Sequence, residues 1–97
     1  MRHFHRTSLA PDIVLETADR FFDALGLSHG GKASRARSFA GVLGQLALTV
    51  KMDGGHYTVV EVHTDQVGES RLDKNVKKFF VALHRRADPR HAIEAGY

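Results

Sequence analysis

The sequence predicts an α+β domain: an antiparallel sheet of three to four strands with two amphipathic helices packed on one face, in the order strand, helix, two or three strands, helix. Two observations support this class. Apolar residues recur at helical spacing in two separate stretches, and between these stretches apolar and polar residues alternate as they do in strands. Because a chain of 97 residues sustains one hydrophobic core, we place a single domain at 1–88 and a C-terminal tail at 89–97.

The first two elements follow from alternation and then from helical spacing. Residues 2–7 alternate basic or imidazole side chains around Phe4, which predicts a short strand with Phe4 pointing inward. Pro11 suits the first turn of a helix, and Gly26 suits its end. One side of this helix is apolar and should face a core. The apolar stripe consists of Val14, Ala18, Phe21, Phe22 and Leu25.

The middle of the chain predicts a loop and then strands. Residues 28–37 are polar, basic and contain glycine, so we expect a loop there. The following run, 37–52, forms either one bent strand or two strands joined by a turn, because Gly41 and Gly44 interrupt it. Residues 56–64 alternate again and predict the next strand.

The turn between these strands can be predicted from the side-chain period. A slip of one residue would move one strand's apolar side chains to the opposite face. A three-residue loop of Asp53, Gly54 and Gly55 keeps the apolar sets together, with a glycine in the left-handed conformation. The predicted pairs are Val50 with Thr58, Leu48 with Val60 and Leu46 with Val62 on one face, and Gln45, Ala47, Thr49 and Lys51 with His63, Glu61, Val59 and Tyr57 on the other.

The last helix begins at Ser70, which has the spacing of a capping box with Asp73, and ends before Pro89. Its apolar residues repeat the pattern of the first helix position for position: Leu72, Val76, Phe79, Phe80 and Leu83. The outer sides of the two helices differ in charge. The first is acidic (Asp12, Glu16, Asp19 and Asp23) and the last is basic (Lys74, Lys77, Lys78 and Arg85).

Composition narrows the class of protein. The chain contains no cysteine, which excludes disulfide scaffolds, cysteine zinc sites and thiol catalysis. No apolar run approaches the roughly twenty residues of a membrane span, and no apolar stretch follows the charged N-terminal residues as in a secretory signal. We therefore expect a cytoplasmic protein with no membrane partner.

One motif suggests nucleotide binding but is incomplete. The stretch GLSHGGKAS, 26–34, nearly forms a phosphate-binding P-loop, yet Ala33 stands where Ser or Thr must hold magnesium. A P-loop also follows a strand and precedes a helix, whereas here a helix comes first. We expect an ordinary basic connector and no cofactor.

Histidine spacing suggests a metal site that also lacks a ligand. A strand places His3 and His5 on one face, and zinc would need a third ligand such as Glu61 or His63 to converge on them. Nothing in the sequence brings these strands together, so we expect surface imidazoles and no bound metal.

The candidate ligand-binding residues lie on the polar side of the central strands: Tyr57, Val59, Glu61, His63 and Gln45. A carboxylate beside an imidazole can exchange protons if partly buried, but antiparallel sheets commonly leave one face to solvent or to another subunit, and we predict no catalytic residue. If the long strand bends, this face becomes concave and could bind an apolar small molecule. The contacts would be Phe4, Leu43, Ala47, Tyr57 and Val59, with Glu61 and His63 orienting the ligand. A homodimer through the sheet would use the same face.

The alternative is a nucleic-acid-binding module. The basic side of the last helix and the preceding basic loop could both contact phosphates. The residues are Lys32, Arg35 and Arg37 in the loop and Lys74, Lys77, Lys78 and Arg85 in the helix.

Two families resemble parts of the chain. The opening HRTSLAPDIVLETAD, 5–19, and the long amphipathic last helix resemble the START-related superfamily of polyketide cyclases and lipid-transfer proteins. This resemblance implies a curved sheet closed by the last helix, here in reduced form, with a small cavity or one completed by dimerisation. The order helix, strands, helix also resembles double-stranded-RNA-binding domains, with Gly68 and Ser70 in comparable places. That family's lysine cluster is replaced by Arg71, Leu72, Asp73 and Lys74, and its Gly-Pro-x-His turn is missing.

Overall fold

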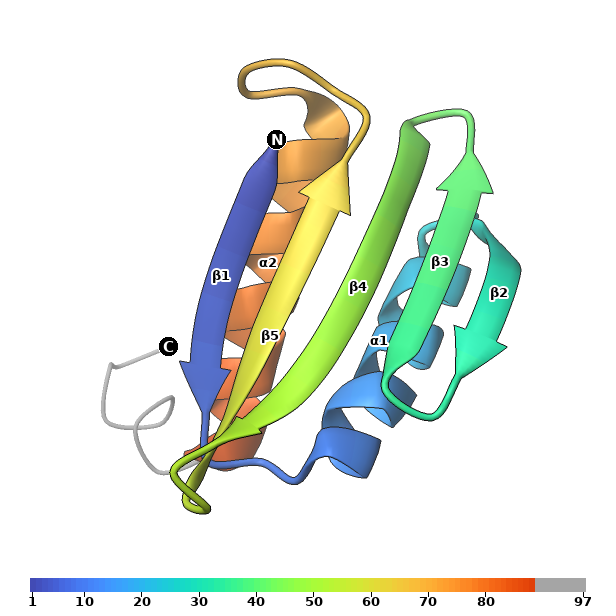
Figure 1. The fold of residues 1–97 in the computed structure, drawn as a ribbon. Helices are drawn as coiled ribbons and strands as arrows, with labels where there is room; N and C mark the ends of the chain where they lie inside the picture. Colours follow the sequence, from blue (N-terminus) through green and yellow to red (C-terminus); the bar gives the residue numbers. More distant parts are fainter. Residues whose placement is uncertain (89–97) are drawn as a thin grey trace.

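Five strands and two helices make up the protein, as a computed structural model shows for residues 1–88; the predicted tail at 89–97 lies outside the described residues. The order is β1 (Arg2–Thr7), α1 (Pro11–Ala24), β2 (Ser28–Ala33), β3 (Ala36–Gly41), β4 (Gly44–Asp53), β5 (Tyr57–Thr64) and α2 (Arg71–Ala87) (Figure 1). All strands form one antiparallel sheet, ordered β1-β5-β4-β3-β2. The predicted α+β class is confirmed, with five strands in place of three to four.

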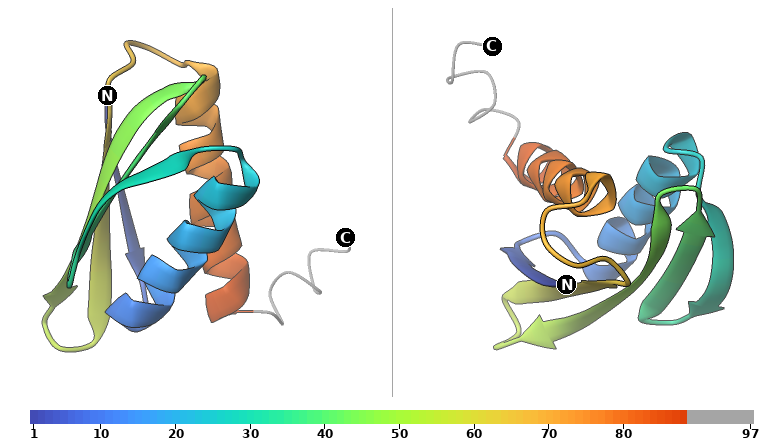
Figure 2. Two further views of the ribbon diagram at one scale, coloured as in Figure 1. Left: turned by 90° about the vertical axis from the view of Figure 1, so that its right-hand side faces the viewer. Right: turned by 90° about the horizontal axis from the view of Figure 1, so that it is seen from above.

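Both helices lie on the same side of the sheet, as predicted (Figure 2). Helix α1 packs over β4, β3 and β2, and α2 packs over β1 and β5. The sheet bends so that β2 lies beside α1 (Figure 2), so the helices occupy its concave side. The opposite side, which we call the open face, is covered by no element among residues 1–88.

Strand β2 was not predicted. Residues 28–37 were expected to form a loop, but Ser28–Ala33 pairs with β3 at the edge of the sheet. All six of its residues are exposed, so no apolar alternation marks it in the sequence. Its pairing register shifts between His29 and Lys32, as in a β-bulge. Strand β2 is therefore held by backbone hydrogen bonds to β3 and not by burial of apolar side chains.

Residues 37–52 form two strands joined by a turn, which resolves the alternative left open by the sequence. Val42 is fully exposed at the tip of this turn, and Leu43 packs against the edge of the core. Gly44 begins β4 with a positive φ of 128°, a conformation that favours glycine. Leu43 was expected to contact a ligand on the open face, but the turn carries it away from that face.

The β4–β5 loop has three residues, but not those predicted. Asp53 pairs with Tyr57, so the loop consists of Gly54, Gly55 and His56. Both glycines have positive φ angles, 66° and 77°, which lets the chain turn one residue later than expected. The observed pairs include Val50 with Val60 and Leu48 with Val62. Because the register differs from the prediction by an even number of residues, each side chain still lies on its predicted face.

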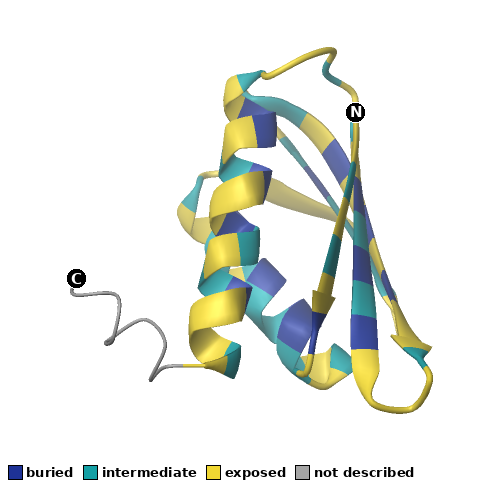
Figure 3. Ribbon diagram, turned by 90° about the vertical axis from the view of Figure 1, so that its left-hand side faces the viewer, coloured by how far each residue is buried: buried dark blue, intermediate teal, exposed yellow. Residues whose placement is uncertain are grey.

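The core lies between the sheet and the helices. Phe22 contacts both Phe39 of β3 and Phe79 of α2, with ring centroids 5.1 Å apart in each pair. The predicted stripes are largely confirmed, since Val14, Ala18 and Phe22 of α1 and Leu72, Val76, Phe79 and Leu83 of α2 are buried. Phe21, Leu25 and Phe80 are only partly buried. Figure 3 shows buried positions on the side of α2 that faces the sheet and exposed positions along its outer side.

Strand β1 has the opposite orientation to the one predicted. Phe4 pairs with Glu61 and is 57% exposed on the open face, whereas His3 and His5 face α2. Both imidazoles contact α2 on that side. His3 forms a hydrogen bond with Asp73, and the His5 ring stacks on Phe80 with the ring centroids 5.0 Å apart. No helix within residues 1–88 is long and apolar enough to cross a membrane.

Candidate functional site

The open face is built from alternate residues of four strands, since their neighbours in the sequence point into the core. It brings together all five predicted ligand-binding residues, Gln45, Tyr57, Val59, Glu61 and His63. The other open-face residues are Arg2, Phe4 and Arg6 of β1, Ala47, Thr49 and Lys51 of β4, and Ala36, Ser38 and Ala40 of β3.

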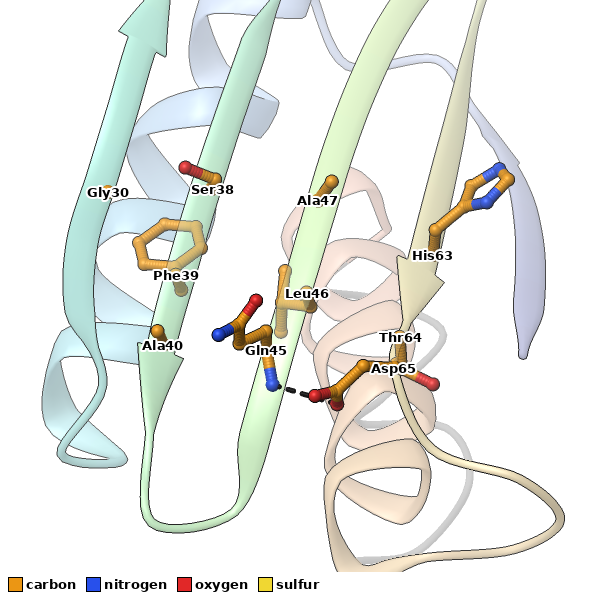
Figure 4. Close-up of a pocket in the computed structure, with 10 residues that line it drawn as sticks. All are labelled: Gly30, Ser38, Phe39, Ala40, Gln45, Leu46, Ala47, His63, Thr64 and Asp65. Atoms are coloured by element: carbon orange, nitrogen blue, oxygen red, sulfur yellow. Dashed lines mark hydrogen bonds between the residues drawn. The ribbon is translucent and has the colours of Figure 1, made fainter.

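The observed register changes which of these residues are neighbours. His63 was expected beside Gln45 but lies opposite Ala47, and Glu61 lies opposite Thr49. Gln45 instead meets Asp65, whose carboxylate accepts a hydrogen bond of 2.9 Å from the Gln45 backbone N–H (Figure 4). His63 therefore stands beside a methyl group rather than an amide, which leaves open space next to its ring.

Small side chains create a groove on the open face over β3 and β4. One hollow of about 440 Å³ extends from Gly30 and Ala40 across β4 to His63 (Figure 4). A second, of about 320 Å³, runs along the same strands. The two hollows share Ser38 and Ala47, and together we call them the groove. The groove is open along its length. Because the sheet's concave side faces the helices, the open face is not concave as a whole, and only this shallow depression corresponds to the predicted pocket.

Aromatic side chains form a ridge beside the groove, over β1 and β5. Phe4 is 57% exposed and Tyr57 is 46% exposed, with partly buried Val59 between them. The guanidinium groups of Arg2 and Arg6 lie over the rings of Phe4 and Tyr57, at 5.8 and 5.4 Å from the ring centres. We call Phe4, Val59 and Tyr57 the ridge.

Most charged side chains of the open face pair with one another, whereas exposed Lys51 makes no ion pair among the described residues. Glu61 contacts His63, and its Oε1 lies 3.5 Å from Nε of Arg2. The hydrogen bond with His63, assisted by Arg2 and Lys51, lowers the pKa of Glu61. Glu61 is therefore an ionised carboxylate at neutral pH and cannot act there as a proton donor. Arg6 pairs with Asp53 in the same way.

The predicted histidine ligands do not converge with Glu61 and His63. Strands β1 and β5 are neighbours, as that site required, but His3 and His5 face the helices while Glu61 and His63 lie on the open face. No group of three potential metal ligands occurs within the part of the chain that the structure describes.

A buried polar cluster joins β1, β5 and α2, and sequence reasoning missed it. The Asp73 side chain is completely buried and accepts hydrogen bonds from His3 at 2.7 Å, Thr64 at 2.8 Å and Ser70 at 2.6 Å. Ser70 caps α2 as predicted, since its hydroxyl oxygen accepts from the Asp73 N–H. Burial alone would raise the pKa of Asp73, but the three hydrogen bonds outweigh it and hold the pKa at about 2.

The predicted nucleic-acid residues occupy two separate places. Lys32 and Arg35 lie at the β2–β3 edge, whereas the basic residues of α2 lie over β1 and β5, the opposite half of the sheet (Figure 1). Arg37 faces the helices, where its Nε donates to Asp19 at 3.1 Å. Lys77 pairs with Glu69. The set therefore does not form one surface, and Arg37 is engaged within the fold.

The groove residues were also missed by sequence reasoning. Ala36, Ser38 and Ala40 alternate along β3, which is the spacing that places small side chains on one face of a strand. This alternation was visible in the sequence, but it begins within residues 28–37, which were expected to form a loop, so it did not indicate a groove. A comparison of the chain with protein-family models and with curated proteins finds no match.

Proposed function

We propose that this chain is a self-associating binding protein that forms a homodimer through its open face. The observation that carries the proposal is the presence of a ridge and a groove side by side on one uncovered sheet face. A face-to-face pair of sheets buries both open faces, as in a β-sandwich, and keeps the helices on the outside.

The ridge and the groove have the arrangement that a two-fold interface needs. The ridge lies over β1 and β5, and the groove lies over β3 and β4, at similar distances from the line between β5 and β4. A two-fold axis along that line brings β1 and β5 of one copy over β4 and β3 of the other, so that the same face is used twice and the Phe4 end of the ridge meets the groove. Such an axis preserves position along the strands, and Phe4 is level with Glu61, Thr49 and Ala36. Phe4 would then lie against Ala36 and Thr49 of the partner copy, which line the second hollow of the groove.

The charge distribution supports burial of this face. A buried charge without a partner costs several kcal/mol, roughly, in free energy of association. Arg2 and His63 already contact Glu61, and Arg6 already pairs with Asp53. These groups enter the interface already partnered, so Lys51 is the one open-face cation that would need a partner from the second copy or a place at the interface rim. The ridge supplies the aromatic contact area that interfaces favour.

A second candidate function is binding of an apolar small molecule in the groove. Its larger hollow, at about 440 Å³, falls in the range of roughly 300–1,000 Å³ that is usual for ligand pockets. Because the groove is open in one chain, a second copy would have to close it, as the resemblance to START-related proteins implies. The cytoplasmic location stays a prediction from the sequence.

Analytical ultracentrifugation over a wide range of concentrations tests the association. Phe4→Ser removes part of the ridge, and Ala47→Glu places a charge in the groove; both positions are exposed, so the fold is retained. We expect each change to weaken dimerisation at least tenfold, about 1.4 kcal/mol. Val67→Ser is the matched control, because Val67 is 97% exposed outside this face.

The control should associate as strongly as the unchanged chain. A chain that stays monomeric at the highest concentration, or one that loses dimerisation equally in Val67→Ser, contradicts the proposal. Monomers that bind an apolar fluorescent probe, with loss of binding in Ala47→Glu, would instead favour the second candidate.

A further inference from the structure

The outer side of α2 carries a row of positive charges. Arg71, Lys74, Lys78 and Arg85 are exposed and recur at three-, four- and seven-residue intervals, with exposed Val81 between the last two. This spacing keeps them on one side of the helix, away from the sheet. Figure 3 shows the corresponding exposed outer side of α2. We call these four cations the basic stripe.

The cations of the basic stripe have no partner within the fold. Their side chains make no hydrogen bond or ion pair with any residue from 1 to 88. Two neighbouring cations do have partners, since Lys77 pairs with Glu69 and Arg86 donates to the Thr17 hydroxyl at 2.9 Å. The only carboxylate within α2, that of Asp73, is buried on its inner side. The stripe is therefore a line of four cations without an ion pair among residues 1–88, although the Glu69 carboxylate is close enough to Lys74 to act on it electrostatically.

The charges of neighbouring elements do not cancel the stripe. Helix α1 turns Thr17 and Phe21 toward α2, since these residues contact Arg86 and Phe79. At 100° per residue, Asp12, Asp19 and Asp23 project away from that side. Asp19 is paired with Arg37 of β3, and Glu16 is paired with Arg20. Glu69, at the start of the stripe, is paired with Lys77.

The dimensions and chemistry of the stripe fit the backbone of a nucleic-acid duplex. From residue 71 to residue 85 the helix rises about 21 Å, which exceeds the roughly 12 Å width of the major groove of B-form DNA and so also spans the narrower major groove of A-form RNA. A bilayer would be expected to take up apolar side chains as well, but Leu72, Val76 and Phe79 are fully buried and Val81 alone is available. The stripe has no aromatic residue on which single-stranded bases could stack.

We infer that the basic stripe of α2 binds the phosphate backbone of double-stranded nucleic acid without reading its sequence. This activity is independent of the proposed association through the open face, because α2 lies on the opposite side of the sheet. With four phosphate contacts, log Kd should change with log salt concentration with a slope of about 3 to 4. Lys32 and Arg35, at the other half of the sheet, should not contribute.

Fluorescence anisotropy with labelled DNA and RNA duplexes of about two helical turns tests the inference. In Lys74→Ala/Lys78→Ala we expect weaker binding to both duplexes and a salt slope reduced by about 2. The control Lys32→Ala/Arg35→Ala removes the same charge elsewhere and should bind like the unchanged chain. No saturable binding at low salt, or equal losses in the two variants, would overturn the inference. Binding to phosphatidylserine vesicles without binding to duplexes would overturn it in favour of a membrane surface.

Discussion

His3 Nε2 donates a hydrogen bond of 2.7 Å to the carboxylate of Asp73, although the two residues are 70 positions apart in the sequence. The contact joins the edge strand β1 to the first turn of α2. Thr64 and Ser70 donate to the same carboxylate, so one buried side chain connects two strands and the helix cap. The pairing of β1 with β5, and the packing of α2 on both strands, place these segments together, and the polar cluster fixes their position.

Replacing Asp73 by Ala should be among the most damaging single changes in the chain. It leaves the His3, Thr64 and Ser70 donors without their acceptor in a largely buried setting, where each unsatisfied donor costs about 1–3 kcal/mol. Urea unfolding followed by circular dichroism measures the loss. Ser70→Ala is the comparison, because it removes the cap but leaves the carboxylate two donors, and we expect a loss of about 1 kcal/mol. Equal stabilities for the two variants would show that Asp73 serves only the cap.

Acid should remove the stabilisation that Asp73 provides. The pKa of Asp73 is about 2 in the folded chain and 3.8 at its ordinary value, so the unfolded chain takes up the proton first as the pH falls. Stability from this group is complete above pH 3.8 and is lost as the pH falls toward 2. The difference corresponds to about 2 kcal/mol. Other carboxylates titrate in the same range, and the variant described next separates their contribution.

Asp73→Asn isolates this group, because the amide resembles the carboxylate in shape and does not titrate. We expect the free energy of unfolding of the unchanged chain to fall more steeply between pH 4 and pH 2 than that of the variant, by about 2 kcal/mol in total. Parallel pH profiles for the two proteins would mean that the cluster does not hold Asp73 ionised.

The helices and central strands were predictable because their signals are local. The two Phe-Phe pairs, at 21–22 and 79–80, lie at equal spacing within their apolar stripes, and one member of each pair, Phe22 and Phe79, is fully buried. Side-chain period alone placed the residues of β4 and β5 on their correct faces. The exact pairing of β4 with β5 could not be predicted from the sequence, because it depends on which residues of the turn adopt positive φ angles, and these are Gly54 and Gly55.

The features that were missed depend on contacts between distant segments. Strand β2 has no apolar pattern, so only its pairing with β3 reveals it. Phe4 was expected to face the core because it is apolar. The hydrogen bond between His3 and the buried Asp73 carboxylate places His3 on the helix side of β1, and Phe4, as the next residue of the strand, therefore lies on the open face. The candidate ligand-binding residues were predicted to share a face, and they do. The groove beside them required the position of β3, which the sequence left undecided.

Gly44 tests the turn that positions the groove. Its φ of 128° lies in a region that other residues rarely adopt, and a Cβ there would stand 2.5 Å from Gln66 Nε2 and 2.7 Å from Asp65 Oδ1. That Asp65 oxygen already accepts the Gln45 N–H, so it cannot move without breaking a hydrogen bond. Gly44→Ala should therefore lower the free energy of unfolding by about 1–3 kcal/mol. Urea unfolding measures the change.

Gly31→Ala is the matched control for that experiment. Gly31 also belongs to a strand that borders the groove, but its φ is not in the left-handed region, and an added Cβ meets only Ser38 Oγ at 3.6 Å, an ordinary contact. We expect its stability to change by less than about 0.5 kcal/mol, as for an exposed surface position. Because Asp65 also lines the groove, Gly44→Ala should weaken dimerisation as well. Gly31 lines the groove too, so Gly31→Ala is a control for stability alone. If Gly44→Ala were as stable as the control, residues 41–44 would have to turn with a different backbone conformation, and the groove would have a different shape.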